Sequence, residues 1–521
     1  MTKSLTTLLR IASWALLLFA LAWTVWYLFA GFGNPMDPHY WLYKYSTLKG
    51  GWLSAGTILT GGMIVRLFGV ELLPLRIAGW VCVAAAIALP YCILLTREQR
   101  RANIHWLALA YLLMQYGAFQ EFSPGTLSVL LLSLLWVTSV KSQIINYKLQ
   151  ILTAILLGIA VSVRFPNILA LLILIPLWKK RCLWNIPIAA AVAGLVYLLG
   201  YWLVTPAAAD ASMMTSHGLQ TMLSKYMDKA PLLVGMLFVS VGVLAIGHLR
   251  DNMRIKHPAP LAGFLVGVAL VFFLIGTTKP HQWYNTDLTY LISAICLVLA
   301  IVPSFVHSFT PSLLVGTAFM VVATLGTDTA WLKLFPAVLC LLPVAAVDYA
   351  PEKRVYLWTM LAVFSIFVAS RMSTNSVGQS DLTKATAFAS VSPYKGIAIQ
   401  PAEQERLMQY KADFDSLSNE QMVNILALGQ EMHLMRAVTG CGAARYNEFW
   451  SNIFDSVYTA KYRDIIIEEQ PIVFCSFTPQ FKTKKSYTDG ASALELMLLD
   501  EGYRPLDRTQ YKYMIYIPSE H

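Results

Sequence analysis

Long apolar runs recur along the first 370 residues and leave few charges between them. A membrane-spanning helix needs about 20 apolar residues, and thirteen runs come near that length. They cover residues 11–30, 74–95, 104–119, 124–140, 150–163, 166–178, 184–204, 231–249, 260–277, 286–303, 310–326, 331–347 and 354–370. Only 13% of the 521 residues are charged, against roughly 25% in soluble domains. We therefore expect a polytopic α-helical membrane protein with about 13 transmembrane helices.

The charges between the runs predict the orientation. The net charge of +10 is unevenly distributed, because residues 371–521 contain 15 Lys or Arg and 18 Asp or Glu. The first 370 residues therefore contain 24 Lys or Arg and 11 Asp or Glu, and the whole basic excess lies there. If all thirteen runs span, the basic turns share one side, which the positive-inside rule makes cytoplasmic. These turns contain Arg97, Arg100, Arg101, Lys141, Lys148, Lys179, Lys180, Arg181, Arg250, Arg254, Lys256, Lys353 and Arg354. The pattern predicts a cytoplasmic N-terminus and an extracytoplasmic C-terminus in a plasma membrane (the inner membrane in a bacterium), and it excludes nucleic-acid binding.

Three parts are expected along the chain. Residues 1–370 form the transmembrane domain, whose first outer loop, residues 31–73, is too long for a plain connection; its apolar stretch 53–67 suggests interfacial helices. Residues 371–395, rich in Ser, Thr and Gly, predict a linker.

Residues 396–521 alternate between strand and helix patterns, which predicts a small extracytoplasmic α/β domain. The predicted strands are 396–400, 471–477 and 511–518, and the predicted helices are 401–428, 459–469 and 491–501. Covering a site and structural support are both open roles for it. Cys441 and Cys475 could form a disulfide, which spacing alone does not show.

The segment Gly33–Trp41 follows the first apolar run and carries the acid Asp37 beside His39, Tyr40 and Trp41. Asp37 is one of few acids in the first half of the chain. Because Asp-Pro is also common turn chemistry, a turn or a helix cap is the alternative to a chemical role. An acid beside the membrane and among aromatic residues suggests chemistry on a lipid-linked molecule.

Three further ionisable residues are expected on the same side as Asp37, where they are functional candidates. Arg76 begins the second span, and snorkelling to the interface is its alternative role. Glu121 precedes the fourth span, where it would also favour the helix dipole. Arg164 joins two spans in an apolar connection and suits an anionic group such as a lipid phosphate.

A basic and aromatic segment after the ninth span could also bind phosphate. It contains Lys279, His281 and Tyr284. His39, His217 and His281 share a side, but no spacing supports a metal site. No cofactor is predicted, and a divalent metal is left open.

Taken together, these features resemble the GT-C superfamily of polyprenyl-phosphate-sugar-dependent glycosyltransferases, in the branch of the protein O-mannosyltransferases and lipid A aminoarabinose transferases. The likeness consists of an acid in a long first outer loop, Leu75-Arg76 at the second span, and an acid with Ser123-Pro124 before the fourth. The late basic segment, the number of spans and the outer C-terminal domain complete it. Relatives often carry a second acid where this chain has Pro38, and the Lys-Pro-Pro signature of the aminoarabinose transferases is missing.

The resemblance implies that Asp37 is the general base and that a sugar moves, with inversion, from a polyprenyl phosphate to a lipid, glycan or protein acceptor. Arg76, Arg164 and Lys279 would stabilise the leaving phosphate, while Glu121 would orient the acceptor or hold Arg76. His39, Tyr40, His281 and Tyr284 are further candidates at the outer face.

The composition also fits other membrane proteins. A transporter or lipid flippase would carry ionisable residues at the bilayer midplane, whereas here they gather at the outer ends. A polysaccharide polymerase or ligase would be favoured by an arginine cluster in one large outer loop, which is missing. The sugar, hexosyl or pentosyl, and the acceptor are left open.

Overall fold

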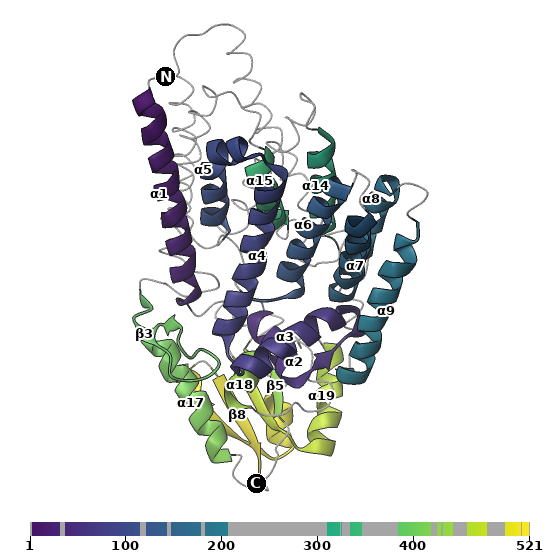
Figure 1. Ribbon diagram of the computed structural model, residues 1–521. Coiled ribbons are helices and arrows are strands. Elements are labelled where there is room, and N and C mark those ends of the chain that lie inside the picture. Colours follow the sequence, from purple (N-terminus) through teal and green to yellow (C-terminus); the bar gives the residue numbers. More distant parts are fainter. Residues whose placement is uncertain are drawn as a thin grey trace.

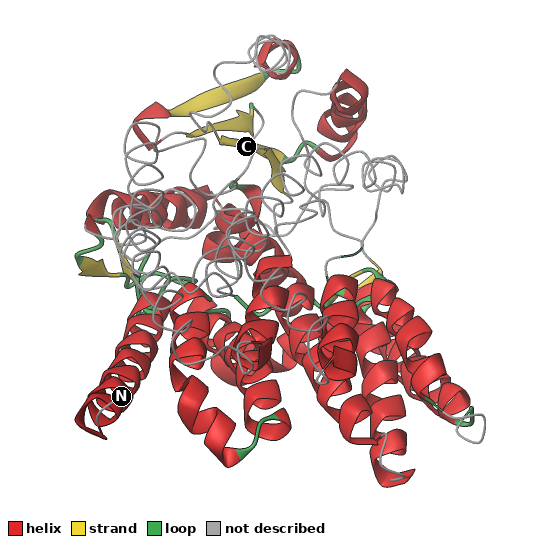
Figure 2. Cartoon of the chain, turned by 90° about the horizontal axis from the view of Figure 1, so that it is seen from above, coloured by secondary structure: helices red, strands yellow, loops and turns green. Residues whose placement is uncertain are grey.

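The computed structural model of the protein describes residues 3–31, 37–114, 121–142, 147–178, 183–206, 310–323, 325, 334–345, 384–417, 425–428, 431–440, 456–476, 495–511 and 513–519. Helices dominate the first part of the chain, and a sheet with helices beside it lies beyond them (Figure 1). The long helices run side by side as a bundle, and the sheet lies beyond one end of it. Figure 2 shows the same division from above, with the strands of the sheet on one side and the bundle on the other.

The helices of the bundle follow the predicted runs. They are α1 (Lys3–Leu28), α4 (Leu72–Leu94), α5 (Arg97–Leu113), α6 (Pro124–Ser142), α7 (Tyr147–Val163), α8 (Ala170–Leu177), α9 (Asn185–Leu203), α14 (Thr310–Val322) and α15 (Leu334–Ala345). In the described part of the chain, four stretches are long and apolar enough to cross a membrane: Ile11–Leu28, Leu72–Leu94, Pro124–Lys141 and Asn185–Leu203. The protein is therefore a polytopic helical membrane protein. The predicted spans 231–249, 260–277, 286–303 and 354–370 lie outside the described residues, so the number thirteen stays a prediction.

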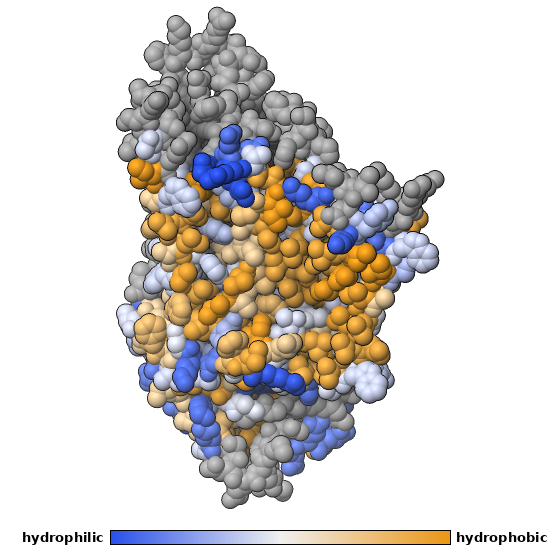
Figure 3. Space-filling view, viewed as in Figure 1, coloured by the Kyte–Doolittle hydropathy of each residue, from blue (hydrophilic) through white to orange (hydrophobic). Residues whose placement is uncertain are grey.

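The surface of the bundle fits a lipid environment. On the face shown in Figure 3, hydrophobic residues form an almost continuous surface over the helices, and hydrophilic residues gather at its two ends. Large apolar side chains such as Leu18, Leu172 and Trp202 of the bundle helices are exposed. In water such a surface would be unfavourable, whereas a bilayer accepts it.

The first loop folds into two short helices under the bundle, α2 (Asp37–Thr47) and α3 (Ala55–Phe68), joined by β1 (Lys49–Gly50) and a 3₁₀ turn, Trp52–Ser54. With 14 residues, α3 is too short for a span, as predicted for residues 53–67. β1 pairs with β2 (Thr205–Pro206) at the end of α9.

The C-terminal region contains a four-stranded sheet in the order β5-β6-β8-β7. Its strands are β5 (Ile425–Leu428), β6 (Ile472–Ser476), β7 (Tyr503–Arg508) and β8 (Tyr513–Pro518), and its helices are α17 (Pro401–Leu417), α18 (Met432–Thr439) and α19 (Ser456–Glu469). β5 and β6 are parallel and the other neighbours antiparallel.

Several predicted elements differ from those observed. The helix predicted over 401–428 is wrong at its end, because α17 stops at Leu417 and residues 425–428 form β5. The run Ile-Leu-Ala-Leu is buried throughout, and a short apolar run of this kind fits a central strand as well as a helix. α18 and β7 were not predicted. Cys475 of β6, considered above for a disulfide, carries a free thiol.

Residues 384–400 connect the two parts of the molecule. They contain a hairpin of β3 (Ala387–Phe388) and β4 (Ala398–Ile399). The Ala398 amide donates to Phe29 at 2.7 Å, and its carbonyl accepts from Gly31 at 2.8 Å. Leu72 donates to the Pro393 carbonyl at 2.8 Å. The hairpin therefore joins the end of α1 and the start of α4.

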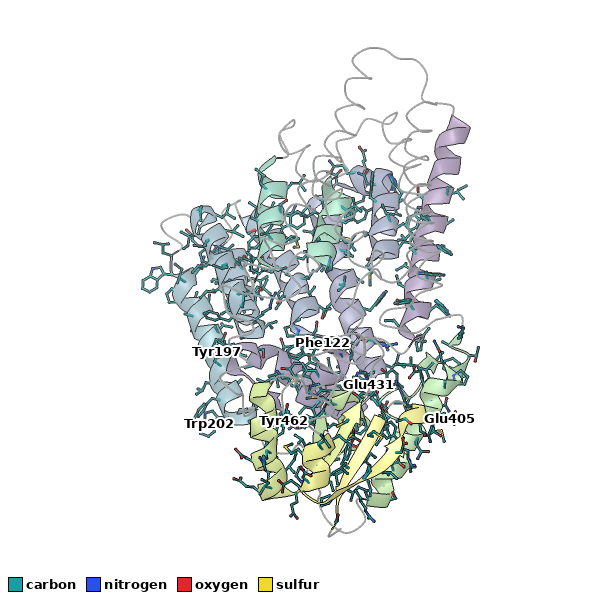
Figure 4. All side chains as sticks on the ribbon, turned by 180° about the vertical axis from the view of Figure 1, so that it is seen from behind. Phe122, Tyr197, Trp202, Glu405, Glu431 and Tyr462 are labelled. Carbon is teal, nitrogen blue, oxygen red and sulfur yellow. The ribbon has the colours of Figure 1, made fainter. Side chains whose placement is uncertain are left out.

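A single apolar core continues across this junction. We call it the junction core; it combines Leu42, Tyr45, Val65, Leu72 and Leu75 of the membrane part with Tyr394, Ile397, Leu407, Tyr410, Ile425, Met432, Phe474 and Tyr513. Burial of large side chains from both parts favours a fixed arrangement. Figure 4 places Phe122 and Glu431 at the level where the bundle meets the sheet.

Candidate functional site

Arg76 is the centre of a buried polar network at the end of the bundle nearest the sheet. It lies in the first turns of α4, and its side chain is fully buried. Its Nε donates to Glu121 Oε1 at 3.3 Å, its Nη1 to the Ala30 carbonyl at 3.3 Å, and its Nη2 to the Gly31 carbonyl at 3.0 Å. A guanidinium with several acceptors in one plane suits such burial. The network fixes the end of α1 against α4.

Glu121 reaches Arg76 from the segment before α6. Its neighbour Phe122 donates its amide to the Leu75 carbonyl at 2.8 Å and accepts from the Tyr45 hydroxyl at 3.1 Å. These bonds hold the segment against both α4 and α2. The structure thus brings Arg76 and Glu121 together, as one of the two predicted roles of Glu121 requires.

Asp37 is the first residue of α2, and its side chain lies outside the described residues. The helix after it is anchored by two hydrogen bonds. His39 is fully buried and shares a hydrogen bond of 2.9 Å between its Nε2 and the Tyr394 hydroxyl. Tyr45 binds Phe122 as described. The backbone that carries Asp37 therefore starts from a fixed helix.

Tyr394 links this helix electrostatically to the arginine network. Burial raises the pKa of the Tyr394 hydroxyl well above its usual range, with smaller effects from Arg76 and Glu121. Tyr394 therefore stays protonated and can donate to His39. His39, Tyr394, Arg76 and Glu121 form one polar cluster at the junction.

Arg164 directly follows α7. Its Nη1 donates to the Ala323 carbonyl at 2.7 Å, and its Nη2 donates to the Leu325 carbonyl. Both carbonyls follow the last turn of α14, where a positive charge suits the helix dipole. The hydrogen bonds of Arg164 and Arg76 therefore lead to different helices. Lys279, His281 and Tyr284 lie outside the described residues.

Tyr40 belongs to a second cluster that sequence analysis did not find. The Lys44 Nζ lies 4.1 Å from the centre of the Tyr40 ring, and the His433 ring centre lies 5.0 Å from it. On the other side, His433 lies 5.8 Å from the Tyr43 ring, and the Arg436 guanidinium carbon lies 5.5 Å from that ring. Lys44, His433 and Arg436 are all buried. The i, i+3 spacing of His433 and Arg436 could have indicated this shared face, had α18 been predicted.

Metal ligands do not gather in the described part of the chain, where no three His, Cys, Asp or Glu side chains come together. The chemistry that the described site can support is proton transfer and binding of anionic groups, since its polar groups are carboxylates, imidazoles, cations and hydroxyls.

Comparison with known proteins gives one kind of match. No protein-family model matches the sequence, and no curated protein matches it. The chain resembles the crystal structure of ArnT from Cupriavidus metallidurans in the apo state, with 11% identity, a TM-score of 0.44, and coverage of 97% of this chain and 98% of that chain. It resembles ArnT bound to undecaprenyl phosphate with 11% identity, a TM-score of 0.41, and coverage of 99% and 98%.

Proposed function

We propose that the protein is an integral membrane glycosyltransferase that moves a sugar from a polyprenyl phosphate to a lipid, glycan or protein acceptor at the outer face of the membrane. The observation that carries the proposal is the buried Arg76–Glu121 pair, which fixes the end of α1 just before the segment that leads to Asp37. A catalytic group must be held in position to act efficiently. The network supplies that rigidity on the membrane side, and the His39–Tyr394 contact supplies it from the C-terminal side.

Asp37 acts as the general base in this proposal. Its carboxylate accepts the proton of the acceptor hydroxyl, whose oxygen forms a bond to the anomeric carbon. The bond between that carbon and the phosphate oxygen breaks, and the phosphate leaves with the electron pair. Attack on the face opposite the phosphate inverts the anomeric centre, and Asp37 ends protonated.

The leaving phosphate gains charge and needs fixed cations. Arg164 and Lys279 are the proposed contacts. The described hydrogen bonds of Arg76 and Arg164 go to protein oxygens, which supports a positioning role for both in addition to the predicted phosphate contacts. The contact of Glu121 with Arg76 likewise supports the role of holding that arginine.

The test is Asp37→Asn in the full chain, purified and returned to membranes. Transfer from a polyprenyl-phosphate-linked sugar should fall about 10²–10⁴-fold, the usual contribution of a general base. Asp415→Asn is the matched control, because Asp415 is exposed on α17 and pairs with Lys411. Full transfer by Asp37→Asn would contradict the assignment of the base, while loss of transfer in both variants would point to a general effect on the protein.

The donor class has its own test. Undecaprenyl phosphate carrying different sugars should support transfer, and the same sugars on nucleoside diphosphates should not. Transfer from a nucleotide sugar alone would overturn the proposed donor.

A further inference from the structure

Three basic side chains converge between α2 and α18, outside the Arg76–Glu121 network. On α2, Tyr40, Tyr43 and Lys44 share one face because they lie three and four residues apart. On α18, His433 and Arg436 share a face for the same reason. The two faces meet, as the ring contacts of His433 with Tyr40 and Tyr43 show. We call Lys44, His433 and Arg436 the basic cluster.

His433 gives this cluster an unusual property. It is 1% exposed, and neither its Nδ1 nor its Nε2 has a hydrogen-bond partner in the part of the chain that the structure describes. Buried polar atoms of proteins nearly always have one, and leaving them without one costs free energy. An imidazole with two unused nitrogens, buried between two cationic side chains, is therefore suited to a ligand with oxygen acceptors.

The charges around His433 indicate the sign of that ligand. Burial lowers the pKa of His433 well below its usual range, and Arg436, Lys44 and His39 lower it further. Burial also lowers the pKa of Lys44 to about 7. An anion bound between these groups would raise the pKa values of both His433 and Lys44, because it stabilises their charged forms.

The groups around this point come from three elements. Glu431, at the start of α18, is bound by Arg406 and Tyr410 of α17. Among the described residues, the titratable and charged groups next to His433 are His39, Tyr40, Tyr43 and Lys44 of α2 and Arg436 of its own helix.

We propose that Lys44, His433 and Arg436 form a binding site for a phosphate group, held between the first loop and the C-terminal region. Ammonium, imidazolium and guanidinium groups are the side chains that bind phosphate oxygens most strongly. Since the ligand contacts α2 and α18 at once, its binding stabilises the junction between them. The phosphate can belong to a lipid headgroup or be free in solution, and the two sources differ in the test below.

The experiment measures binding and needs no sugar transfer, so failure of the proposed function leaves it intact. The full chain is placed in nanodiscs, and its thermal unfolding midpoint is followed while inorganic phosphate is added against sodium chloride of equal ionic strength. A second series compares nanodiscs containing undecaprenyl phosphate with nanodiscs containing undecaprenol, which has no phosphate. Either phosphate should raise the midpoint, since a ligand that binds the folded state stabilises it. A rise with inorganic phosphate identifies free phosphate as sufficient, and a rise with undecaprenyl phosphate alone identifies a lipid headgroup.

Variants connect the effect to the basic cluster. His433→Gln and Lys44→Met should each weaken phosphate binding about tenfold or more, the usual effect of losing a hydrogen bond to a charged group. Lys411→Met removes an exposed lysine of α17 and should leave binding unchanged. Binding to the unaltered chain should also be tighter at pH 6 than at pH 8, and His433→Gln should reduce this difference.

Two results would overturn the proposal. One is a midpoint that neither phosphate raises above the salt control. The other is an equal rise in the unaltered chain, His433→Gln and Lys44→Met, which would place the phosphate elsewhere.

Discussion

Arg76 is a fully buried cation whose charge is compensated within the protein. Its partners are one carboxylate, Glu121, and backbone carbonyls at the end of α1. Removing a buried charge from water is costly, and an ion pair offsets this cost only when the remaining hydrogen bonds are made. Removing only Arg76 or only Glu121 should therefore destabilise the protein more than removing both.

This asymmetry gives a prediction for single and double variants. Arg76→Met should destabilise the protein by about 3–5 kcal/mol, the usual cost of breaking a buried pair from one side, because it leaves the Glu121 carboxylate buried. The double variant Arg76→Met/Glu121→Leu should lose less than the sum of the two single variants. Thermal unfolding in detergent measures both. Arg66→Met on the exposed side of α3 is the control, and additive losses would show that the two residues do not interact.

Some of these residues could be predicted from the sequence, and others could not, for physical reasons. Arg76 and Glu121 were selected because charges beside a membrane are expensive and few. His433 and Arg436 were missed because no helix was predicted over α18 and because their burial depends on α2, which is far away in sequence. The contact between Arg76 and the end of α1 also could not be predicted. Its acceptors are backbone carbonyls, which every residue type carries.

At the scale of elements, the packing of α7 on α9 depends on one small residue. A Cβ at Gly158 would lie 2.5 Å from the Ala189 carbonyl oxygen and 2.7 Å from the Val192 Cβ. Small residues allow membrane helices this close approach. By contrast, nothing lies within 4 Å of the Cβ position of Gly194 on α9.

The two glycines form a matched pair for mutation. Gly158→Leu should destabilise the protein by about 1–3 kcal/mol, as overpacking does, because α7 and α9 must separate. Gly194→Leu is the control, because it makes the same substitution at a position where the added Cβ meets no other atom. The thermal midpoints of both variants, purified in the same detergent, measure the effect, and an equal loss in both would indicate that helix propensity rather than packing decides.

In the C-terminal region, α17 is joined to β7 and β8 through Asp413. Arg508 donates to both oxygens of this carboxylate, Nε to Oδ2 at 2.9 Å and Nη2 to Oδ1 at 2.9 Å, and the Tyr513 hydroxyl donates to Oδ2 at 2.6 Å. Burial alone would raise the pKa of Asp413, but the hydrogen bonds from Arg508, Tyr513 and Gln409 lower it below the usual range.

A pH dependence follows from this lowered pKa. Because the unfolded chain binds the proton more readily, Asp413 contributes stability above about pH 4 that is lost as the pH falls through the lower pKa of the folded state. Asp413→Asn should therefore reduce stability by about 2 kcal/mol at pH 7 and by progressively less toward pH 3. The unfolding midpoint of both proteins between pH 3 and pH 7 tests this. A difference that stays constant with pH would assign the effect to packing instead of charge.

The elements themselves were predictable where periodicity or length was decisive. Each of the nine predicted spans that fall on described residues coincides with a helix. The error at residues 425–428 arose because four apolar residues fit a helix face and a buried strand equally well, and only pairing with β6 decides. β7 was missed because its burial pattern is mostly exposed, so it shows no apolar alternation.

At the scale of the whole molecule, the structure places the first loop and the C-terminal region together. His39 contacts Tyr394, and Tyr40 contacts His433, so α2, the segment 384–400 and α18 belong on the same side of a membrane. α4 runs from this junction to the opposite end of the bundle, where α5 begins at Arg97 (Figure 1). The charge pattern predicts that the end with Arg97 is cytoplasmic.

Labelling of introduced cysteines tests this orientation. In intact cells, Lys411→Cys on α17 should react with a thiol reagent that cannot cross membranes, while Arg97→Cys should react only after the cells are opened. Both positions are exposed, so accessibility differs only by side. The unaltered protein gives the background from its own cysteines. Labelling of Arg97→Cys alone in intact cells would reverse the predicted orientation.

The hydrogen bonds between Ala398 and residues 29 and 31 also set an order of assembly. A ribosome makes the end of α1 at the start of translation, but its partner emerges only after the last predicted span has been made. Until then the buried face of the junction core has no cover on its outer side. We therefore expect a chain terminated before residue 384 to leave its part of the junction core uncovered and to be recognised as incomplete by the cell's quality control, even when its N-terminal helices are inserted.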